Sequence, residues 1–153
     1  MAATAIGNPA GAVQLFDGGN PRVVGGYAYG TNVSGGVLVF ASGATGVVSS
    51  GANSFVPGTD LGFAIDASGT QFNGIALWSA GSNTALSVAT RGAFLLVCNG
   101  TVVPGEQVKC DGNNAVQPLG STADSLAKGS SMTVGRALTA GASGGYALVD
   151  IHG

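Results

Sequence analysis

The chain has 153 residues, among them 28 glycines and 5 prolines, and a formal net charge of −2. A fold of about 150 residues buries roughly 70% of the surface of its unfolded chain, so one domain with a real core is expected. Only 8% of the residues are charged, against roughly 25% in an ordinary soluble domain, and the 45% hydrophobic content argues against disorder over the whole length.

The composition predicts an all-β fold whose outer surface is covered by partners. Val, Thr, Ser and Ala are abundant, whereas the helix formers Glu, Lys and Gln are scarce. With so few charges, much of the surface must be apolar, and exposed apolar area beyond a few hundred Å² usually marks an interface. We therefore expect a subunit of an assembly.

Membranes, secretion signals and nucleic acid are not expected. The longest uninterrupted apolar run, AFLLVC at residues 93–98, is far shorter than the ~20 residues that span a bilayer. The N-terminal sequence lacks the basic region and the continuous apolar region of a secretory signal. Lys and Arg are scattered, whereas phosphate binding needs clustered cations.

The first 32 residues differ from the rest of the chain. They are rich in Gly, Ala and Asn, and they contain only two short strand-like pieces, at residues 13–16 and 22–29. We predict an extended Gly-rich N-terminal arm over residues 1–32 and a single β domain over residues 33–153. Deleting residues 2–30 is then expected to leave the β domain folded.

Aromatic side chains are the candidates for contact with a partner. A Gly-rich arm has little core of its own in which to bury three aromatic rings, and aromatic residues are enriched at binding hot spots. For Trp78, the only tryptophan, packing in the core is the alternative. The candidate interface residues, together with one arginine of the arm, are Phe16, Arg22, Tyr27, Tyr29 and Trp78.

Strand signals strengthen after residue 35. The Asn-Gly and Pro-Gly pairs at residues 99–100 and 104–105 predict turns, because Gly and Asn tolerate positive φ and Pro fixes φ. Residues 122–128, TADSLAK, are the only plausible helical turn, with Thr122 as its N-cap. The expected strands outside the arm include GVLVFAS at 36–42, LGFAI at 61–65, AFLLVC at 93–98 and EQVKC at 106–110.

One pattern occurs twice, at residues 74–92 and 135–153. Both stretches have the same length, begin with Gly-x-Ala-Leu and contain a second Ala-Leu near their end. In each, a cluster of small turn-forming residues separates an apolar run from a segment of alternating character. Period-two alternation indicates strands, and the small residues between them indicate a turn. The sequence therefore predicts the same β-hairpin used twice.

Nothing in the sequence predicts an enzyme. Asp150 and His152 would share a face of the last strand, but no Ser or Cys can be assigned to complete a triad, so we interpret them as part of an exposed terminal strand. Ser125 and Lys128 match S-x-x-K, the acylating motif of penicillin-binding enzymes, without the companion S-D-N and K-T-G motifs.

No metal or cofactor is expected. Cys98 and Cys110 flank the Pro-Gly turn, but one His and no C-x-x-C leave a zinc site without ligands. We expect free thiols, since a disulfide needs an oxidising compartment. The segments at residues 17–20 and 111–114 resemble fragments of a calcium loop but lack its spaced carboxylates and terminal Glu, so Asx turns explain both.

Several segments in a fixed order carry a family resemblance. They are GIAL at residues 74–77, VATRGAF at 88–94, PGEQV at 104–108 and GRALTAGASGGYALVDI at 135–151. Together they resemble the small capsid cement, or head decoration, proteins of tailed bacteriophages. The resemblance covers about half of the chain, and Glu106 stands where that family usually has Asp.

The resemblance implies a β-tulip or small β-barrel-like subunit. Such a subunit forms a homotrimer on the outer surface of an icosahedral head, at junctions between hexamers of the major capsid protein. It is a virion protein assembled in the bacterial cytoplasm of the host, and it is not an enzyme and takes no small-molecule substrate. The five candidate interface residues would then contact the capsid or the neighbouring subunits.

Two other function classes stay open on the sequence. A secreted carbohydrate-binding or adhesin-like β domain would retain sugars and would carry a disulfide between Cys98 and Cys110. A hydrolase built on Ser125 and Lys128 would react with an acylating probe.

Overall fold

The structure, a computed structural model, describes residues 14–16, 22–42, 61–65, 71–112, 114–120 and 132–152. Every element with assigned bounds in these ranges is a strand, which confirms the predicted all-β class. The strands are β1 (Gln14–Phe16), β2 (Val23–Ala28), β3 (Leu38–Ala41), β4 (Gly62–Ile65), β5 (Gly74–Ala76), β6 (Ala85–Ala89), β7 (Arg91–Val97), β8 (Gln107–Asp111), β9 (Ala115–Pro118), β10 (Thr133–Ala137) and β11 (Tyr146–His152).

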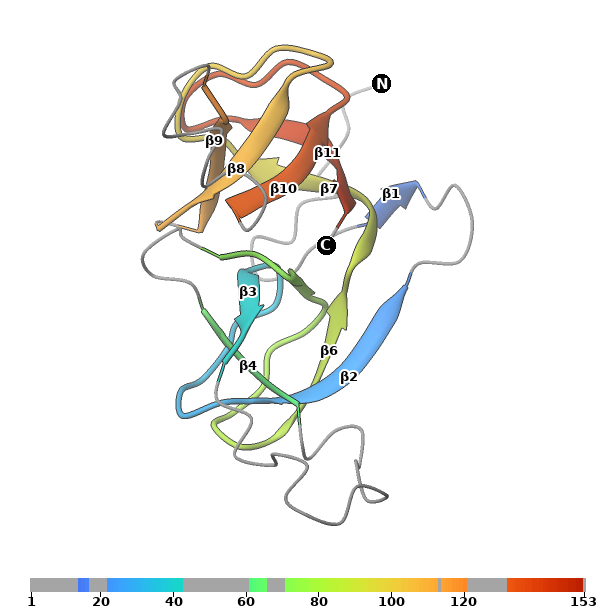
Figure 1. Cartoon of the computed structure of the whole chain (residues 1–153), viewed down its shortest axis with the longest axis vertical. Coiled ribbons are helices and arrows are strands. Elements are labelled where there is room, and N and C mark those ends of the chain that lie inside the picture. The colour runs from blue at the N-terminus through green and yellow to red at the C-terminus, as the bar shows by residue number, and fades with distance from the viewer. Residues whose placement is uncertain are drawn as a thin grey trace.

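The strands form two sheets that lie one above the other along the longest axis of the molecule (Figure 1). The lower sheet is a closed barrel in the order β2-β4-β3-β5-β6, in agreement with the small barrel that the family resemblance implies. The upper sheet has the order β1-β7-β11-β10-β8-β9. From β2 onward the chain completes the lower sheet before it enters the upper one, passing directly from β6 to β7, while β1, which precedes β2, pairs with β7 in the upper sheet.

Both predicted hairpins are present. In the first, β5 pairs with β6 in antiparallel register, with Ile75 opposite Ala89. In the second, β10 pairs with β11 in the same manner, with Gly135 opposite Ile151. The loops also begin alike, because the backbone N–H of Leu77 donates to Ser87 O at 2.9 Å and that of Leu138 donates to Leu148 O at 2.7 Å.

The duplication extends beyond the hairpins to all ten strands from β2 to β11. We call residues 22–90, with β2 to β6, the first unit and residues 91–152, with β7 to β11, the second unit. Equivalent strands make equivalent pairs: β3 with β4 and β8 with β9, β3 with β5 and β8 with β10, β2 with β6 and β7 with β11. The duplicated backbone contacts include Val33 with Ala80 and Val102 with Gly141, Gly36 N to Ala76 O and Gly105 N to Ala137 O, and Asn83 N to Ala28 O and Gly144 N to Cys98 O.

The two units differ mainly in how they close. In the first unit β2 pairs with β4 in parallel, with Ala28 opposite Phe63. The second unit has a single parallel bridge at the equivalent place, between Cys98 and Val116. The closing backbone hydrogen bonds are again equivalent: Tyr29 N to Phe63 O at 2.8 Å and Asn99 N to Val116 O at 2.7 Å. The second unit is therefore the same five-stranded fold with a shorter closing contact.

A complementary exchange of side-chain size keeps both units packed. In the first unit a Cβ on Gly26 would meet the carbonyl oxygen of Leu61 and would lie 2.7 Å from the ring of Phe63, so the glycine makes room for both. The equivalent residues of the second unit are Leu96 and Val116, both buried. A close-packed interior tolerates little change in total volume. The first unit therefore combines the small Gly26 with the large Phe63, and the second unit combines the larger Leu96 with the smaller Val116.

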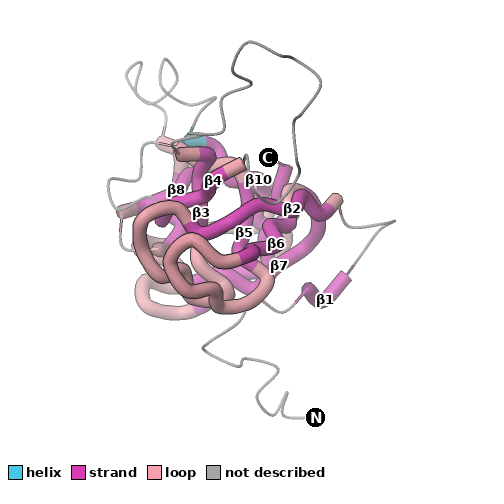
Figure 2. The backbone as a smooth tube through the Cα atoms, turned by 90° about the horizontal axis from the view of Figure 1, so that it is seen from below, coloured by secondary structure: helices cyan, strands magenta, loops and turns pink. Residues whose placement is uncertain are grey.

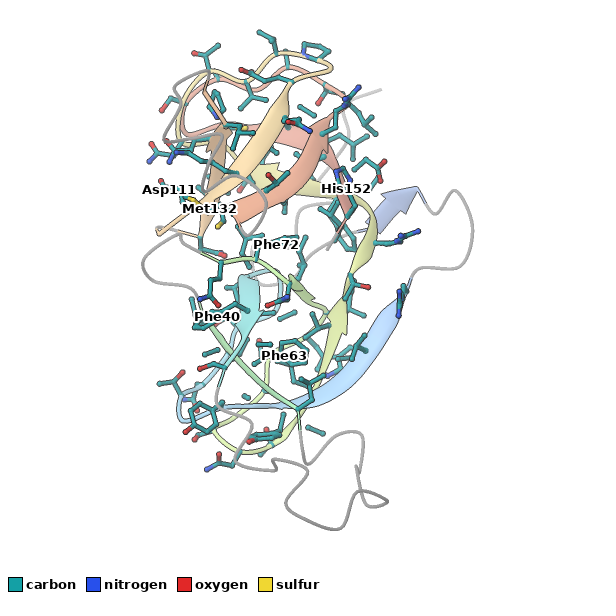
Figure 3. All side chains as sticks on the ribbon, in the orientation of Figure 1. Phe40, Phe63, Phe72, Asp111, Met132 and His152 are labelled. Atoms are coloured by element: carbon teal, nitrogen blue, oxygen red, sulfur yellow. The ribbon has the colours of Figure 1, made fainter. Side chains whose placement is uncertain are left out.

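The units share one hydrophobic core. Leu38, Phe72, Ile75 and Ala89 of the first unit belong to the same buried cluster as the core strands of the second unit, and Figure 3 shows Phe72 between the two sheets. A second cluster, which includes Phe63, fills the rest of the barrel. Polar contacts also cross the junction: Leu38 N donates to Asn114 Oδ1 at 2.6 Å, and Cys110 Sγ lies 3.5 Å from Gln71 O.

The predicted arm needs a correction at its C-terminal end. Residues 23–28 form β2, which pairs with both β4 and β6, and Ala28 is completely buried. The boundary expected at residue 32 therefore cuts through the barrel. Of the residues before β2, the structure describes Gln14–Phe16, which pair with β7 at the edge of the upper sheet. The helical turn predicted at residues 122–128 lies outside the described residues.

Candidate interaction surface

The loops of the two units form two tips at opposite ends of the molecule. The first tip consists of residues 29–37 and 77–84, and the second tip consists of the equivalent residues 99–106 and 138–145. In Figure 1 the first tip lies at the lower end of the folded strands and the second tip at the upper end, while in Figure 2 the first tip faces the viewer.

Hydrogen bonds from backbone N–H groups to side-chain oxygens fix both tips. In the first tip, Asn32 Oδ1 accepts from Ser82 N at 2.9 Å, and Ser79 Oγ accepts from Gly35 N at 3.0 Å. In the second tip, Glu106 Oε2 accepts from Val103 N at 3.1 Å, and Thr139 Oγ1 accepts from Leu148 N at 2.9 Å. These hydrogen bonds between backbone N–H groups and side chains of the loops hold each tip in one conformation.

Exposed apolar side chains gather at the tips. Of the six large hydrophobic residues that are exposed in the described ranges, Val23 alone lies away from them. Trp78, 54% exposed, is in the first tip. The other four lie in the second tip or on the strand residues that border it: Val97 at 38%, Val103 at 52%, Leu138 at 47% and Tyr146 at 53% exposed.

The structure does not bring the five predicted interface residues together. Trp78 is in the first tip, and its exposure excludes the alternative of packing in the core. Tyr27 is only 9% exposed. The expectation that the aromatic rings of the arm have no core in which to be buried is therefore wrong for this residue. Its ring lies edge-on to the half-buried ring of Tyr29, with centroids 6.2 Å apart. Phe16 lies on β1, opposite Ala93 of β7.

Arg22 lies at the edge of a shallow cavity of the first unit. Its carbonyl oxygen accepts from Thr90 N at 2.8 Å and from Thr90 Oγ1 at 3.2 Å. The cavity has a volume of about 290 Å³ and is lined by Arg22, Val24, Ala41, Leu61, Phe63, Asn73 and Thr90. The lining offers one cation and two neutral polar side chains, and it holds no nucleophile paired with a base among these residues.

The residues weighed for chemistry lie apart. Asp150 and His152 are exposed on β11, opposite Ala93 and Arg91 of β7, as the interpretation of an exposed terminal strand requires. Ser125 and Lys128 lie outside the described residues. Within the described ranges, no three His, Cys, Asp or Glu side chains approach closely enough to hold a metal ion. No helix among the described residues is long and apolar enough to cross a membrane.

Both cysteines are buried and free, as expected. Burial raises the pKa of the Cys98 thiol above its usual value of 9.0, and a backbone hydrogen bond from Ala147 opposes that effect without cancelling it. The disulfide on which the secreted alternative depended is therefore not formed. A protonated, buried thiol is also a poor nucleophile.

Asp111 and Asn114, the described ends of one calcium-like segment, are joined by a backbone hydrogen bond. Asn114 has a positive φ of 59°, and its backbone N–H donates to Asp111 O at 3.0 Å. The carboxylate of Asp111 accepts a short hydrogen bond from Asn99 Nδ2. These contacts make a turn through the backbone, with the Asp111 side chain bonded to Asn99, so the Asx turn expected here stays a prediction. The other calcium-like segment, residues 17–20, lies outside the described residues.

Comparisons with known proteins give a fold and no family. No protein-family model matches the chain, and no curated protein matches it. Among solved structures, the head fiber gp8.5 N base of bacteriophage phi29 has a similar fold, with a TM-score of 0.57 and 12% sequence identity. The similarity covers 86% of this chain and 94% of that chain. At this identity the likeness establishes the shared fold.

Proposed function

We propose that the chain is a structural virion protein of a tailed bacteriophage. In this proposal it is a cement or decoration subunit that forms a homotrimer on the outer surface of the head. There it spans junctions between capsomers of the major capsid protein, after assembly in the host cytoplasm, and it acts without catalysis, cofactor or nucleic acid. The observation that carries the proposal is a fold shared, over nearly the whole of both chains, with a base of a phage head fiber.

The order of the family-like segments supports the same proposal. The repeated Gly-x-Ala-Leu segments are the starts of the two hairpins, on β5 and β10. The VATRGAF segment covers the passage from β6 to β7, which is the link between the two units. The PGEQV segment enters β8 from the second tip. The resemblance therefore falls on the elements that organise the fold.

Low charge and exposed apolar tips suit attachment to a protein shell. With 8% charged residues, this chain has few ions to desolvate when a face is covered. A shell presents the same surface many times, so a trimer can make several weak contacts at once. Each later contact is then effectively intramolecular, which gives firm attachment from modest interfaces.

Attachment and stabilisation can be tested in one experiment. The purified chain is sized by light scattering and then mixed with expanded heads that lack it, and the temperature at which the heads release their DNA is measured. We expect a trimer that decorates the heads and raises that temperature. A monomer that never decorates heads would contradict the proposal, whereas decoration without a change in release temperature would leave a head protein and remove the cement role.

A further inference from the structure

The internal duplication offers a comparison of the two tips on the same backbone. Contacts that are equivalent in the two units place Ser34 at the position of Val103 and Ala85 at the position of Tyr146. In the first unit these positions hold a small polar residue and a small apolar one, whereas in the second they hold large apolar side chains that are half exposed. Since the first unit forms the same loops without them, the fold does not require apolar bulk there.

Three of the apolar residues of the second tip share one face of the sheet, and the fourth lies in the facing loop. Val97 and Tyr146 are opposite each other on β7 and β11. Leu138 begins the loop opposite Leu148, which lies on the same face of β11 as Tyr146, because alternate residues of a strand share a face. Val103 is in the facing loop, next to Val102, which pairs with Gly141. We call Val97, Val103, Leu138 and Tyr146 the apolar tip.

The loops that carry the apolar tip hold almost no charge, and the nearest charged residue along β10 is the exposed Arg136, two residues before Leu138. Among residues 97–106 and 138–146, Glu106 is the only charged residue. Its carboxylate is turned into the loop, where it accepts from Val103 N. A partner surface rich in charges would lose its hydration against this tip without gaining an ion pair. The matching surface is therefore apolar and uncharged.

The size of the apolar tip decides what kind of partner it fits. Four side chains of which about half is exposed offer on the order of 300–400 Å² together, since even a large aromatic side chain covers only about 150–250 Å². A stable pair of proteins buries about 800 Å² on each partner. One tip alone is too small to hold a partner or a second copy. Several tips that belong to one oligomer and contact a repeating surface together are large enough for firm attachment.

From these observations we propose that the apolar tip is the surface by which the subunit docks on an uncharged, apolar patch that recurs on the capsid shell. This inference rests on the proposed function and adds to it which end of the molecule faces the shell. The first tip, which carries Trp78 as its one exposed large hydrophobic residue among those described, then faces away from the shell or toward another subunit.

The test replaces the two tip residues by those of the first unit. The double variant Val103→Ser with Tyr146→Ala keeps residues that the equivalent loop already accommodates, and circular dichroism and thermal unfolding check that it folds. We expect an unchanged oligomeric state and half-maximal decoration of heads at a roughly tenfold or higher protein concentration, because each lost contact is repeated in every subunit. The matched control Val23→Ser, at an exposed apolar residue away from both tips, should decorate heads like the unchanged protein.

Each other outcome has a definite meaning. Unchanged decoration by the double variant overturns the docking role of the apolar tip. Loss of the oligomer in the double variant also overturns it, because the tip would then contact a second copy of the chain. If Trp78→Ser no longer decorates heads while the double variant still does, docking belongs to the first tip instead. If the unchanged protein does not decorate heads, the proposed function itself fails and this inference fails with it.

Discussion

Glycine is required where strands of this fold approach closely. A Cβ on Gly135 would lie 2.8 Å from the carbonyl carbon of Asp150 and 2.9 Å from Ile151 Cα, and closer still to Asp150 O. Gly74, its equivalent in the first unit, is similarly enclosed, with Ala89 O at 2.5 Å from the position of a Cβ. The Gly that opens each repeated segment is therefore a packing requirement of the hairpin. The repeated Gly is visible in the sequence, but the close contact that requires it is visible only in the structure.

We expect Gly135→Ala to destabilise the protein by about 2 kcal/mol or more, because a backbone atom of the partner strand cannot move aside as a side chain would. Urea unfolding followed by tryptophan fluorescence or circular dichroism measures the change. Gly25→Ala is the matched control, since a Cβ there meets nothing within 4 Å, and it should change stability by less than about 0.5 kcal/mol. Equal effects at the two positions would contradict the packing argument.

The Cys98 thiol gives the fold a dependence on alkaline pH. Its pKa is higher in the folded protein than the usual value of 9.0 because burial disfavours the thiolate. The folded state therefore holds this proton more tightly than the unfolded state, so the contribution to stability is complete below pH 9 and declines as the pH rises toward the folded-state pKa. Ala28 occupies the equivalent position of the first unit, which makes alanine a substitution that this backbone accepts.

We expect the free energy of unfolding to fall more steeply between pH 8.5 and 10 for the unchanged protein than for Cys98→Ala. The variant should cost roughly 1 kcal/mol at neutral pH because it leaves a small cavity. Urea titrations of both proteins across this range measure the difference. Parallel pH profiles would mean that the thiol has the same pKa in the folded and unfolded states.

At the scale of elements, the sequence predicted hairpins better than it predicted the arm. Both Gly-x-Ala-Leu hairpins were correct because their alternation and turn residues are local signals. The boundary of the arm was wrong by about one strand, because the paired glycines Gly25 and Gly26 weaken the strand pattern of β2. The need for Gly26 comes from the carbonyl oxygen of Leu61 and the ring of Phe63, which are far away in the sequence, and no local pattern reports such contacts.

The apolar tip was missed for a related reason. Val97, Val103, Leu138 and Tyr146 are spread over about fifty residues, and only the fold gathers them at one end of the molecule. The signal that could have found them is the full duplication. GTNVSGG at residues 30–36 resembles GTVVPG at residues 100–105, and once one residue of the longer segment is left unmatched, Val33 aligns with Val102 and Ser34 with Val103. Most other equivalent residues differ, as Gly26 and Leu96 do. The hairpins could therefore be recognised as a repeat from the sequence, whereas the repeat of the whole unit could not.

The position of β2 reverses the earlier expectation for a truncated chain. Deleting residues 2–30 removes a strand that pairs with both β4 and β6, so the barrel cannot close and a core that includes Ala28 and Phe63 is opened. We expect this protein to lose its cooperative unfolding transition. Deleting residues 2–13, which removes none of the described strands, should preserve that transition. A cooperative transition in the longer deletion would contradict the assigned place of β2.

At the scale of the whole molecule, the two units form a body with a shared core in the middle and an apolar end. Attachment through that end should depend little on ionic strength, because salt screens interactions between charges and leaves apolar contacts in place. We expect the concentration for half-maximal decoration to change by less than about threefold between 0.05 and 0.5 M NaCl, where attachment through ion pairs would weaken steeply. Sedimentation of decorated heads at each salt concentration measures it.

The most direct test of the central claim is an electron cryomicroscopy reconstruction of expanded heads incubated with the protein. We expect added density on the outer surface at capsomer junctions, with threefold character and with the second tip, residues 99–106 and 138–145, against the shell. Heads that stay bare, or density in which the first tip contacts the shell, would contradict that claim.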